Sequence, residues 1–582
     1  MYALLRGLRS MTMQMMDFGA AGGVPTPILR APPFPGSVNT VVSRLLDGAE
    51  ACITLDADAR RYMNVLRDAR VGGTFWGARP QLDGRRIIAR PTNSFQADQM
   101  LAKAEREGLQ EALVFWLPPF LAAWGRKRAF ANLIVSGVCD PWHLFEKSEC
   151  LWLDTSDENF LLARVANVRV LPFNENGEES FDDAEEAVED LLVNAVRSVG
   201  YFDPFSGSGT DFFATVALLE FWRNLIDSNR EIAAAAGFAH WKKEAVEPLL
   251  WGGADPVHFI SGKSVELHDI PEGRSLAIWK SRVPPKFLDA TERQGLPMHE
   301  VEDGFIRSAG LGADCVPPLS IVVDKVGVHF DPSGPSELEN LLQHGEFSPT
   351  ILERAERLRR LIIETGVSKY GVGGGVLDRP GGDRRHILVT GQVEDDRSVL
   401  SGGGDVAGNL DLLRRARAQE PNAYIIYKPH PDVEAGHRKG HVPQEQALAF
   451  ANSIVRDAPI SSLLEMVDAV HVLTSLAGFE ALIRSKQVIT HGVPFYAGWG
   501  LTTDLGVVPV RRTARRDVIE MVAAVLLLYP RYLDPVTALP CPPEVLVKRL
   551  VAGIRKENWA IVSLRRLQGS ARQKLSKMGI TI

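Results

Sequence analysis

The sequence predicts an α/β protein in which two domains built on parallel sheets face a cleft and a related α/β region precedes them. Three observations support this prediction. β-like and helical stretches alternate between residues 275 and 482, a glycine-rich segment interrupts them near residue 373, and part of the N-terminal region recurs near the C-terminus. Alternating strands and helices are typical of parallel sheets, and a glycine hinge between two such domains leaves a cleft.

The composition is that of an ordinary globular protein. The 582 residues are 45% hydrophobic and 24% charged, and the length corresponds to about three to four domains. A net charge of −7, from 65 basic and 72 acidic residues, disfavours a broad nucleic-acid-binding surface. Five cysteines without a CxxC pair indicate reduced thiols in a cytoplasmic protein. No apolar run approaches the roughly 20 residues of a spanning helix.

The N-terminal region contains a degenerate copy of a later segment. Leu144–Val170 superimposes without gaps on Leu463–Ile489, and both copies read as helix, strand, Thr-Ser turn, helix and strand. Asn159 and Leu161 stand where the second copy has Gly478 and Glu480. A repeat that keeps packing residues and loses polar ones indicates an inactive duplicate. We assign it to residues 1–198, with a flexible N-terminus and an acidic linker at 174–190.

The remaining elements follow from apolar periodicity. A helical pattern covers Asp211–Trp251, and a further helix is expected over Pro349–Thr365. Before the hinge at 371–375, strands are expected at Ser275–Trp279, Met298–Glu302, Ser320–Val323 and Gly327–Phe330. After it, strands are expected at His386–Thr390, Ala423–Tyr427 and Ala469–Leu473, each followed by a helix. The basic tail after residue 535 either lies on an anionic membrane or packs as a solvated terminal helix.

Polar clusters follow several of these strands, at the edge where open α/β sheets bind ligands. Glu302 and Asp303 end one strand, and because adjacent side chains alternate, we expect only Asp303 to face the cleft. Gly304 would let a ligand approach the backbone, whereas the structural alternative is a turn acid paired with Arg307. The acidic run Glu394–Asp396 invites a metal, but loop and helix N-terminus chemistry is favoured there.

Two further clusters form a predicted nucleotide-phosphate grip. Lys428 and His430 lie in the run Tyr-Lys-Pro-His-Pro at the end of one strand. Thr474 and Ser475 join a neighbouring strand to a helix, where hydroxyl groups cap the helix and its free N–H groups attract anions. Capping alone would explain the hydroxyl pair, but a cation and an imidazole on the adjacent strand end favour phosphate binding.

These stretches resemble the KpsC/LipA family of bacterial capsule polysaccharide proteins. The resemblance covers about residues 201–530 and rests on the runs 302–312, 391–396, 427–433, 474–482 and 494–501. It implies a GT-B fold of two facing Rossmann-like domains, with an acceptor domain at 199–375, a donor domain at 376–535 and a basic helical tail at 536–582. It also implies a retaining glycosyltransferase that moves β-linked 3-deoxy-manno-octulosonic acid (Kdo) from CMP-Kdo, without metal or cofactor.

The resemblance also implies roles for individual residues. Asp303 would be the catalytic nucleophile beside Glu302, and His430, Lys428, Thr474 and Ser475 would hold the phosphate. Gln392, Gly478 and Glu480 would help to bind the donor nucleotide, and Arg307 would meet the Kdo carboxylate. The implied partners are a lipid-linked saccharide acceptor and an inner-membrane capsule assembly or export complex. The implied location is the cytoplasm, with peripheral membrane association as a further expectation.

Two alternatives remain open at this point. One is a GT-B polyol-phosphate transferase that uses a CDP donor, for which a second histidine is needed; His299 and His329 are the candidates. The other is a non-catalytic scaffold for polysaccharide export.

Overall fold

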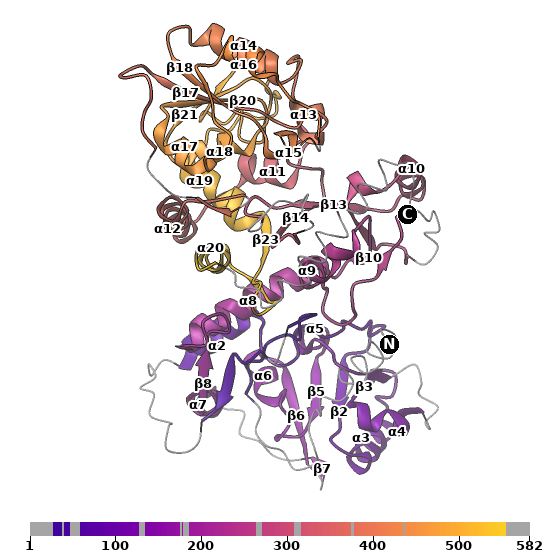
Figure 1. The fold of residues 1–582 in the computed structure, drawn as a ribbon. Coiled ribbons are helices and arrows are strands. Elements are labelled where there is room, and N and C mark those ends of the chain that lie inside the picture. The colour runs from indigo at the N-terminus through magenta and orange to yellow at the C-terminus, as the bar shows by residue number, and fades with distance from the viewer. Residues whose placement is uncertain are drawn as a thin grey trace, which may run out of the picture. The chain divides into compact units, whose positions relative to one another are not determined.

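A computed structural model of the chain describes residues 27–37, 40–46, 59–126, 134–174, 177–178, 185–262, 270–307, 316–369, 371–373, 377–434, 436 and 438–553. It separates into two compact units, with the main change from one to the other between Ser228 and Asn229 (Figure 1). The first unit thus extends past the boundary predicted at residue 198. The reason is packing, because Phe212 at the start of α8 (Phe212–Asn229) lies against Tyr62 and Tyr201 of the first unit.

The first unit is built on a six-stranded sheet of order β4-β3-β2-β5-β6-β7. All neighbouring pairs are parallel except β6 and β7. Apolar side chains of α3 (Ser94–Glu107) and of the central strands form its core. The strands are β2 (Ile87–Arg90), β3 (Leu113–Leu117), β4 (Ile134–Ser136), β5 (Cys150–Leu153), β6 (Arg169–Asn174) and β7 (Gly177–Glu178).

The second unit holds two sheets, and the one nearer the C-terminus is wholly parallel. Its order is β19-β18-β17-β20-β21-β22, which is the 3-2-1-4-5-6 order of a dinucleotide-binding sheet. Its strands are β17 (His386–Thr390), β18 (Tyr424–Lys428), β19 (Ser453–Ile454), β20 (Ala469–Val472), β21 (Gln487–Thr490) and β22 (Thr503–Asp504). The sheet of the first unit has the same order. We call this part of the second unit the donor half.

The predicted repeat occupies equivalent places in these two sheets. The first copy forms α5 (Pro141–Lys147), β5, α6 (Phe160–Val165) and β6, and the second forms α17 (Ile460–Met466), β20, α18 (Leu476–Leu482) and β21. β5 pairs with β2 as β20 pairs with β17. The sequence repeat therefore reflects two copies of one fold.

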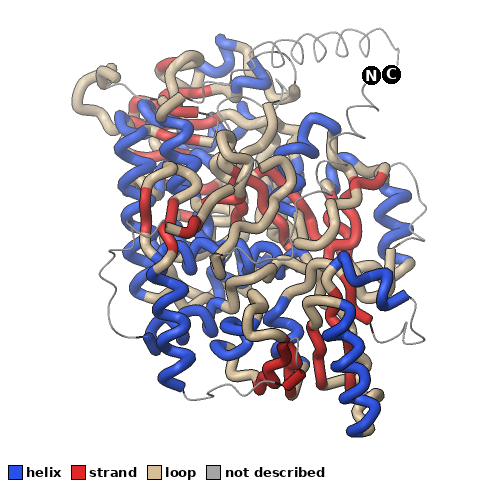
Figure 2. The backbone as a smooth tube through the Cα atoms, turned by 90° about the horizontal axis from the view of Figure 1, so that it is seen from below, coloured by secondary structure: helices blue, strands red, loops and turns tan. Residues whose placement is uncertain are grey.

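The other sheet of the second unit has the order β11-β10-β12-β13-β14-β23-β24. β10 (Ile232–Ala236), β11 (Phe259–Ile260), β12 (Ser275–Ile278) and β13 (Met298–Asp303) are parallel, whereas β14 (Ser320–Asp324), β23 (Pro530–Leu533) and β24 (Pro540–Cys541) are added antiparallel. We call this part the acceptor half. In Figure 2 the strands lie as red segments between blue helices. Two α/β halves with facing strand ends confirm the predicted GT-B fold class.

Two predicted elements are wrong. The helical pattern over 211–251 is divided into α8, β10 and α9 (His240–Leu250), because the alanine run of β10 has no apolar alternation and is read as helix. Gly327–Phe330 forms turns and not a strand. There the carboxylate of Asp324 accepts hydrogen bonds from the backbone N–H groups of Val326 and Gly327, which turns the chain.

The C-terminal segment returns to the acceptor half, so the boundaries predicted at 535 and 536 are also wrong. β23 extends the acceptor sheet by pairing with β14, and α20 (Pro543–Val551) contacts α12 (Pro349–Thr365). Arg354 of α12 forms a two-pronged ion pair with Glu544 of α20, at 2.7 and 2.9 Å. The donor half is therefore an insertion into the acceptor half. Residues 554–582 of the predicted basic tail lie outside the described residues.

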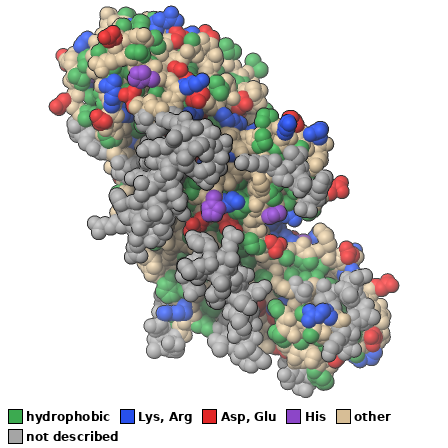
Figure 3. All heavy atoms as spheres, turned by 45° about the vertical axis from the view of Figure 1, so that its right-hand side comes forward, with side chains coloured by type: hydrophobic (Ala, Val, Ile, Leu, Met, Phe, Trp, Pro, Cys, Tyr) green, Lys and Arg blue, Asp and Glu red, His purple; other side chains and the backbone are tan. Residues whose placement is uncertain are grey.

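The surface of the described residues carries both signs of charge. On the face seen in Figure 3, lysine and arginine side chains are interspersed with aspartate and glutamate. No helix in the described part of the chain is long and apolar enough to cross a membrane.

Candidate active site

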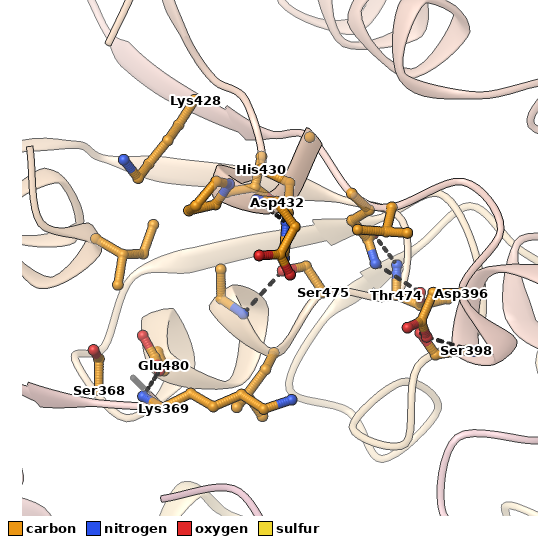
Figure 4. A pocket seen from close by; sticks show the side chains of 18 of the residues that line it. Ser368, Lys369, Asp396, Ser398, Lys428, His430, Asp432, Thr474, Ser475 and Glu480 are labelled. Carbon is orange, nitrogen blue, oxygen red and sulfur yellow. Dashed lines mark hydrogen bonds between the residues drawn. The ribbon is translucent and has the colours of Figure 1, made fainter. Parts of the chain in front are cut away.

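A cavity of about 620 Å³ lies in the second unit, where strand ends of the two halves converge. The acceptor half contributes Glu302 and Asp303 from β13. The donor half contributes the segments that follow β17, β18 and β20, namely 390–393, 428–432 and 474–477 (Figure 4). The carboxyl ends of parallel strands are the expected ligand site of such sheets. The predicted polar clusters thus meet in one cavity.

Asp303 is held between two cations. Its Oδ1 lies 3.2 Å from Lys242 Nζ, and its Oδ2 accepts a hydrogen bond of 2.8 Å from Arg307 Nε. These charges outweigh burial and hold the pKa of Asp303 below its usual value. Lys242 is itself buried over the ring of Trp279, 3.3 Å from the centroid, and burial lowers its pKa to about 8. Asp303 is therefore an ionised carboxylate at neutral pH.

Glu302, the neighbour of Asp303, lies in the opposite electrostatic environment. Burial raises its pKa to about 7, although Arg397 donates a hydrogen bond of 2.9 Å to it. The same Arg397 nitrogen also binds Glu300 at 2.6 Å, so its charge is shared between two carboxylates. Both Glu302 and Asp303 line the cavity, in contrast to the prediction that only Asp303 would. Their side chains still alternate, since Glu302 shares Arg397 with Glu300 while Asp303 meets Lys242 and Arg307, but the cavity at the end of the strand reaches both.

Arg307 does not occupy the predicted substrate-binding position. Its side chain is buried, and besides Asp303 it binds the carbonyl oxygen of Val316 at 3.0 Å. It lies outside the cavity lining, so it orients Asp303. Gly304 is also used differently from the prediction, because a Cβ there would meet the Ser320 hydroxyl at 2.3 Å. It allows close packing of strands and not the approach of a sugar.

His430 presents a defined hydrogen-bond donor to the cavity. The backbone N–H of Asp432 donates to His430 Nδ1 at 3.2 Å, which leaves the proton on Nε2. Burial lowers the pKa of His430, so the ring is neutral at pH 7. Ser475, which also lines the cavity, caps α18 by accepting a hydrogen bond from Ala477 N–H. A neutral N–H donor and a hydroxyl group thus face the same space (Figure 4).

Lys428 and Gln392 line the cavity, but their polar groups are engaged by protein. Lys428 Nζ donates to the carbonyl oxygens of Arg456 and Ala458, at 3.0 and 2.8 Å, and Figure 4 shows it directed away from Ser475. The amide of Gln392 accepts from Thr474 N–H at 2.8 Å and donates to the Thr474 hydroxyl at 3.0 Å. Lys428 therefore holds the 456–458 loop, and Gln392 holds Thr474, instead of the predicted direct ligand contacts.

Glu480 presents a buried acceptor to the cavity. One carboxylate oxygen accepts a hydrogen bond from Lys369 N–H at 3.1 Å, whereas Oε2 is buried without a partner among the described residues. Burial raises its pKa. A buried acceptor of this kind is suited to a ligand hydroxyl group. Gly478 lies outside the lining, and a Cβ there would meet the Tyr496 hydroxyl at 2.2 Å. It serves helix packing and not the predicted donor contact.

The acidic run after β17 is used for local structure. Glu394 accepts a hydrogen bond from Asn409 N–H, Asp395 forms an ion pair with Arg438, and Asp396 caps α13 (Arg397–Gly402). In the described parts of the chain, no group of three or more acidic, histidine or cysteine side chains is arranged to hold a metal ion.

Comparison of the sequence with known proteins identifies the family of the segments that form this cavity. Residues 276–370 and 377–532 match the family model described as "Capsule polysaccharide biosynthesis protein". The two matched segments cover both halves around the cavity. This part of the chain belongs to that capsule polysaccharide family and is related to LipA and LpsZ.

The chain is similar to curated proteins and to a solved structure. It is 38% identical over 355 residues to the capsule polysaccharide modification protein LipA of Neisseria meningitidis serogroup A, covering 60% of this chain and 50% of LipA. It is 47% identical over 244 residues to the lipopolysaccharide-processing protein LpsZ of Rhizobium meliloti, covering 41% and 55%. The chain thus spans about half the length of these relatives.

Among solved structures, the chain is similar to Thermosulfurimonas dismutans KpsC, described as a β-Kdo 2,4 transferase. The identity is 33%, the match covers 55% of this chain and 98% of that one, and the TM-score is 0.48.

In the first unit, side chains of the unit itself occupy the equivalent strand edge. The hydroxyl of Ser156 donates to Asp154, and Arg90 at the end of β2 binds Asp157 at 2.8 Å while stacking on Trp116. A cation thus lies at the end of the neighbouring strand of this copy too, since β2 pairs with β5. Its charge is neutralised by Asp157 and by Glu158 at 3.5 Å.

Three residues of the site were not predicted from the sequence: Lys242, Lys369 and Arg397. Lys242 lies on α9, inside the stretch read as one long helix. Lys369 follows β15 (Val367–Ser368), and Arg397 begins α13. Lys242 comes after β10, which the sequence pattern presents as helix, and Lys369 comes after a strand outside the two large sheets. Arg397 directly follows the acidic run 394–396, where only the carboxylates suggested a ligand.

Proposed function

We propose that this chain is a retaining glycosyltransferase that moves a β-Kdo residue from CMP-Kdo to a saccharide of the capsule or cell surface. The observation that carries the proposal is the pair of adjacent carboxylates, Asp303 and Glu302, whose pKa values are shifted in opposite directions in one cavity. Opposed pKa shifts divide the roles of nucleophile and proton acceptor between neighbouring groups. The choice of Kdo and CMP rests on the motif resemblance.

In the first step, the ionised Asp303 attacks the anomeric carbon of Kdo. The bond from that carbon to the phosphate oxygen breaks, and CMP leaves with the electron pair. His430 Nε2–H and the Ser475 hydroxyl are the donors that face the developing negative charge. Such preorganised donors are the main source of rate enhancement when charge develops in a closed site. The product is an ester between Kdo and Asp303.

In the second step, the acceptor hydroxyl attacks the same carbon and Asp303 is released as a carboxylate. The acceptor must lose a proton, and Glu302 is the adjacent group with a pKa of about 7 that takes it. Two displacements at one carbon restore the original configuration, as in retaining enzymes with a carboxylate nucleophile.

The nucleotide has a site in the donor half. Glu480 Oε2 is the buried acceptor for a ribose hydroxyl group, and the 456–458 loop held by Lys428 borders the same space. A monophosphate leaving group needs no bridging cation, so we propose that transfer requires no metal. Activity should then survive EDTA and the Asp395→Asn substitution. Loss of activity that Mg²⁺ restores would contradict this.

The chain holds one such site in the described residues, since the strand edge of the first unit is filled by ion pairs. We therefore propose that it forms one type of linkage. We further propose that it acts on a lipid-linked saccharide at the cytoplasmic face of the inner membrane, in contact with capsule assembly or export proteins.

One observation favours the alternative of a CDP-polyol transferase. His329 lines the same cavity as His430 and could supply the second histidine of such an enzyme. However, His329 lies against the rings of Phe305 and Phe495, and burial lowers its pKa to about 3, so it stays uncharged at neutral pH. His299 is outside the cavity lining.

Two measurements test the proposal. CMP should raise the Tm of the chain, whereas CDP and UDP should do so less. Incubation with CMP-Kdo and no acceptor should add the mass of one Kdo residue to the peptide that contains Asp303, and Asp303→Asn should abolish this adduct while retaining CMP binding. Stabilisation by UDP in preference to CMP would overturn the choice of donor. Wild-type transfer rates in Asp303→Ala would overturn the mechanism.

A further inference from the structure

Lys369 joins the two halves of the second unit through its backbone. It lies on the connection between them, after β15. Its N–H donates to Glu480 of the donor half at 3.1 Å, and its carbonyl oxygen accepts from Arg307 N–H of the acceptor half at 3.1 Å. The residue is thus fixed between the group proposed to bind ribose and the group that orients Asp303.

The side chain of Lys369 enters the cavity. Lys369 belongs to the cavity lining, and Figure 4 shows its side chain extending past Glu480 into the space beneath Ser475. Its positive charge lowers the pKa values of Asp303, Glu480, His430 and His329. Coulomb interactions weaken with distance and with solvent screening. A single charge therefore influences all four groups because it lies where they converge.

Four cations of the described residues line the cavity, namely Lys369, Lys428, Arg438 and Arg456. Lys428 binds two loop carbonyl groups, Arg438 pairs with Asp395, and Arg456 pairs with Glu434 at 2.7 Å. Of the cations nearest Asp303, Lys242 is buried over Trp279, and Arg307 lies outside the lining. Lys369 lines the cavity, and its charge also lowers the pKa of Asp303.

We propose that Lys369 binds the carboxylate that a keto-sugar acid carries on its anomeric carbon. This inference rests on the proposed function. In such a sugar the carboxylate, the phosphate oxygen and the point of attack by Asp303 share one carbon. An anionic nucleophile must then approach an anionic substrate, and a cation beside it offsets the repulsion. Arg307, which the sequence suggested for this role, is turned towards Asp303 instead.

The orientation of the sugar follows from this contact. A carboxylate bound by Lys369 turns the anomeric carbon towards Asp303, because Arg307 joins the backbone of Lys369 to the side chain of Asp303. A neutral sugar without this carboxylate would lack the contact. Lys369 would therefore select sugar acids over neutral sugars on the same nucleotide.

The test compares Lys369→Met and Lys369→Arg with a matched control, Lys286→Met. Methionine keeps the length of the side chain and both backbone hydrogen bonds but removes the charge. Lys286 is an exposed lysine of α10 (Pro285–Arg293), outside the cavity lining. For each variant we would measure CMP affinity by calorimetry, kcat/KM for CMP-Kdo and the Tm.

If Lys369 binds the sugar carboxylate, Lys369→Met should lower kcat/KM for CMP-Kdo by about 10- to 100-fold, the effect of losing one charge-assisted hydrogen bond. CMP affinity should stay within about twofold of wild type by the same reasoning, since CMP lacks the carboxylate. Lys369→Arg should recover part of the loss, and Lys286→Met should match wild type.

Three outcomes would overturn the inference. Unchanged kcat/KM in Lys369→Met would remove Lys369 from the site. An equal loss of CMP affinity would assign it to the phosphate. A wild-type chain that neither binds CMP nor transfers from CMP-Kdo would overturn the proposed function and this inference together, whereas the first two outcomes leave the proposed function intact.

Discussion

At the scale of single residues, the surroundings of a carboxylate decide its chemistry more than its place in the sequence. Glu302 and Asp303 are adjacent and end the same strand, but Asp303 faces Lys242 and Arg307 while Glu302 shares Arg397 with Glu300. The sequence predicts that strand-end residues line the site, because strand ends can be recognised by periodicity. It does not predict these cation partners, which come from distant segments of the chain.

The pH dependence of transfer should reflect the pKa of Glu302 and the pKa of Lys242, which holds Asp303. Glu302 must be ionised to accept a proton, so kcat/KM should rise with pH through about 7, where its raised pKa lies. Lys242 must be protonated to hold Asp303, and its lowered pKa of about 8 predicts a decline at higher pH. A bell-shaped profile with a narrow optimum between these values is expected. A flat profile from pH 6 to 9 would contradict this assignment.

Replacement of Glu302, the proposed proton acceptor, should slow the second proposed step without preventing the first. Glu302→Gln should still form the adduct on Asp303 but discharge it to the acceptor about 10²- to 10⁴-fold more slowly, as is usual when a general base is lost. The adduct should then accumulate in the presence of acceptor, which mass spectrometry of the intact protein can detect. Normal turnover in Glu302→Gln would exclude Glu302 as the base.

At the scale of elements, the two copies of the repeat share a topology and differ at one strand edge. Val472 of β20 and Leu153 of β5 end equivalent strands, but Gln392 holds Thr474 in one copy and Asp154 binds Ser156 in the other. The sequence predicts the repeat well because packing residues recur at a constant spacing. It fails at β10, whose alanines carry no alternating pattern, and at Gly327, where a carboxylate cap sets the turn.

The equivalent Thr-Ser pairs should respond differently to substitution. Replacement of Thr155 and Ser156 by alanine should leave kcat and KM unchanged, because Arg90 is already paired with Asp157. The matched double variant of Thr474 and Ser475 should lose most of its activity, because it removes a cavity hydroxyl and the partner of Gln392. Steady-state kinetics on both variants makes the comparison. A large fall in kcat for the first variant at unchanged Tm would show that the first unit binds a ligand.

At the scale of the whole molecule, the C-terminal segment belongs to the fold of the acceptor half. The sequence locates two α/β halves through the glycine hinge, but it does not reveal that the chain crosses back after the donor half. That return depends on β14 pairing with β23 and on α12 contacting α20. Both contacts join segments about 200 residues apart, beyond the reach of any local pattern.

Two core substitutions, one in each half, should accelerate amide hydrogen exchange in different strands. Leu546 of α20 and Leu413 of α14 (Asn409–Gln419) are both fully buried, and replacement of a buried leucine by alanine costs about 2–5 kcal/mol. Leu546→Ala should accelerate amide exchange in β14 and β23, and Leu413→Ala should do so in β17 and β18. The opposite pattern, or equal acceleration of all four strands, would contradict the assignment of α20 to the acceptor half.

Because the donor half is inserted between two crossings of the chain, its coding sequence is continuous and is flanked on both sides by that of the acceptor half. The proposed nucleophile Asp303 and its cations Lys242 and Arg307 lie on the flanking part, whereas His430, Ser475 and Glu480 lie on the insert. On the proposed function, one recombination event could therefore exchange the insert and change which nucleotide is recognised, while the carboxylate proposed to form the new bond stays in place. Donor preference and bond formation can thus be inherited separately.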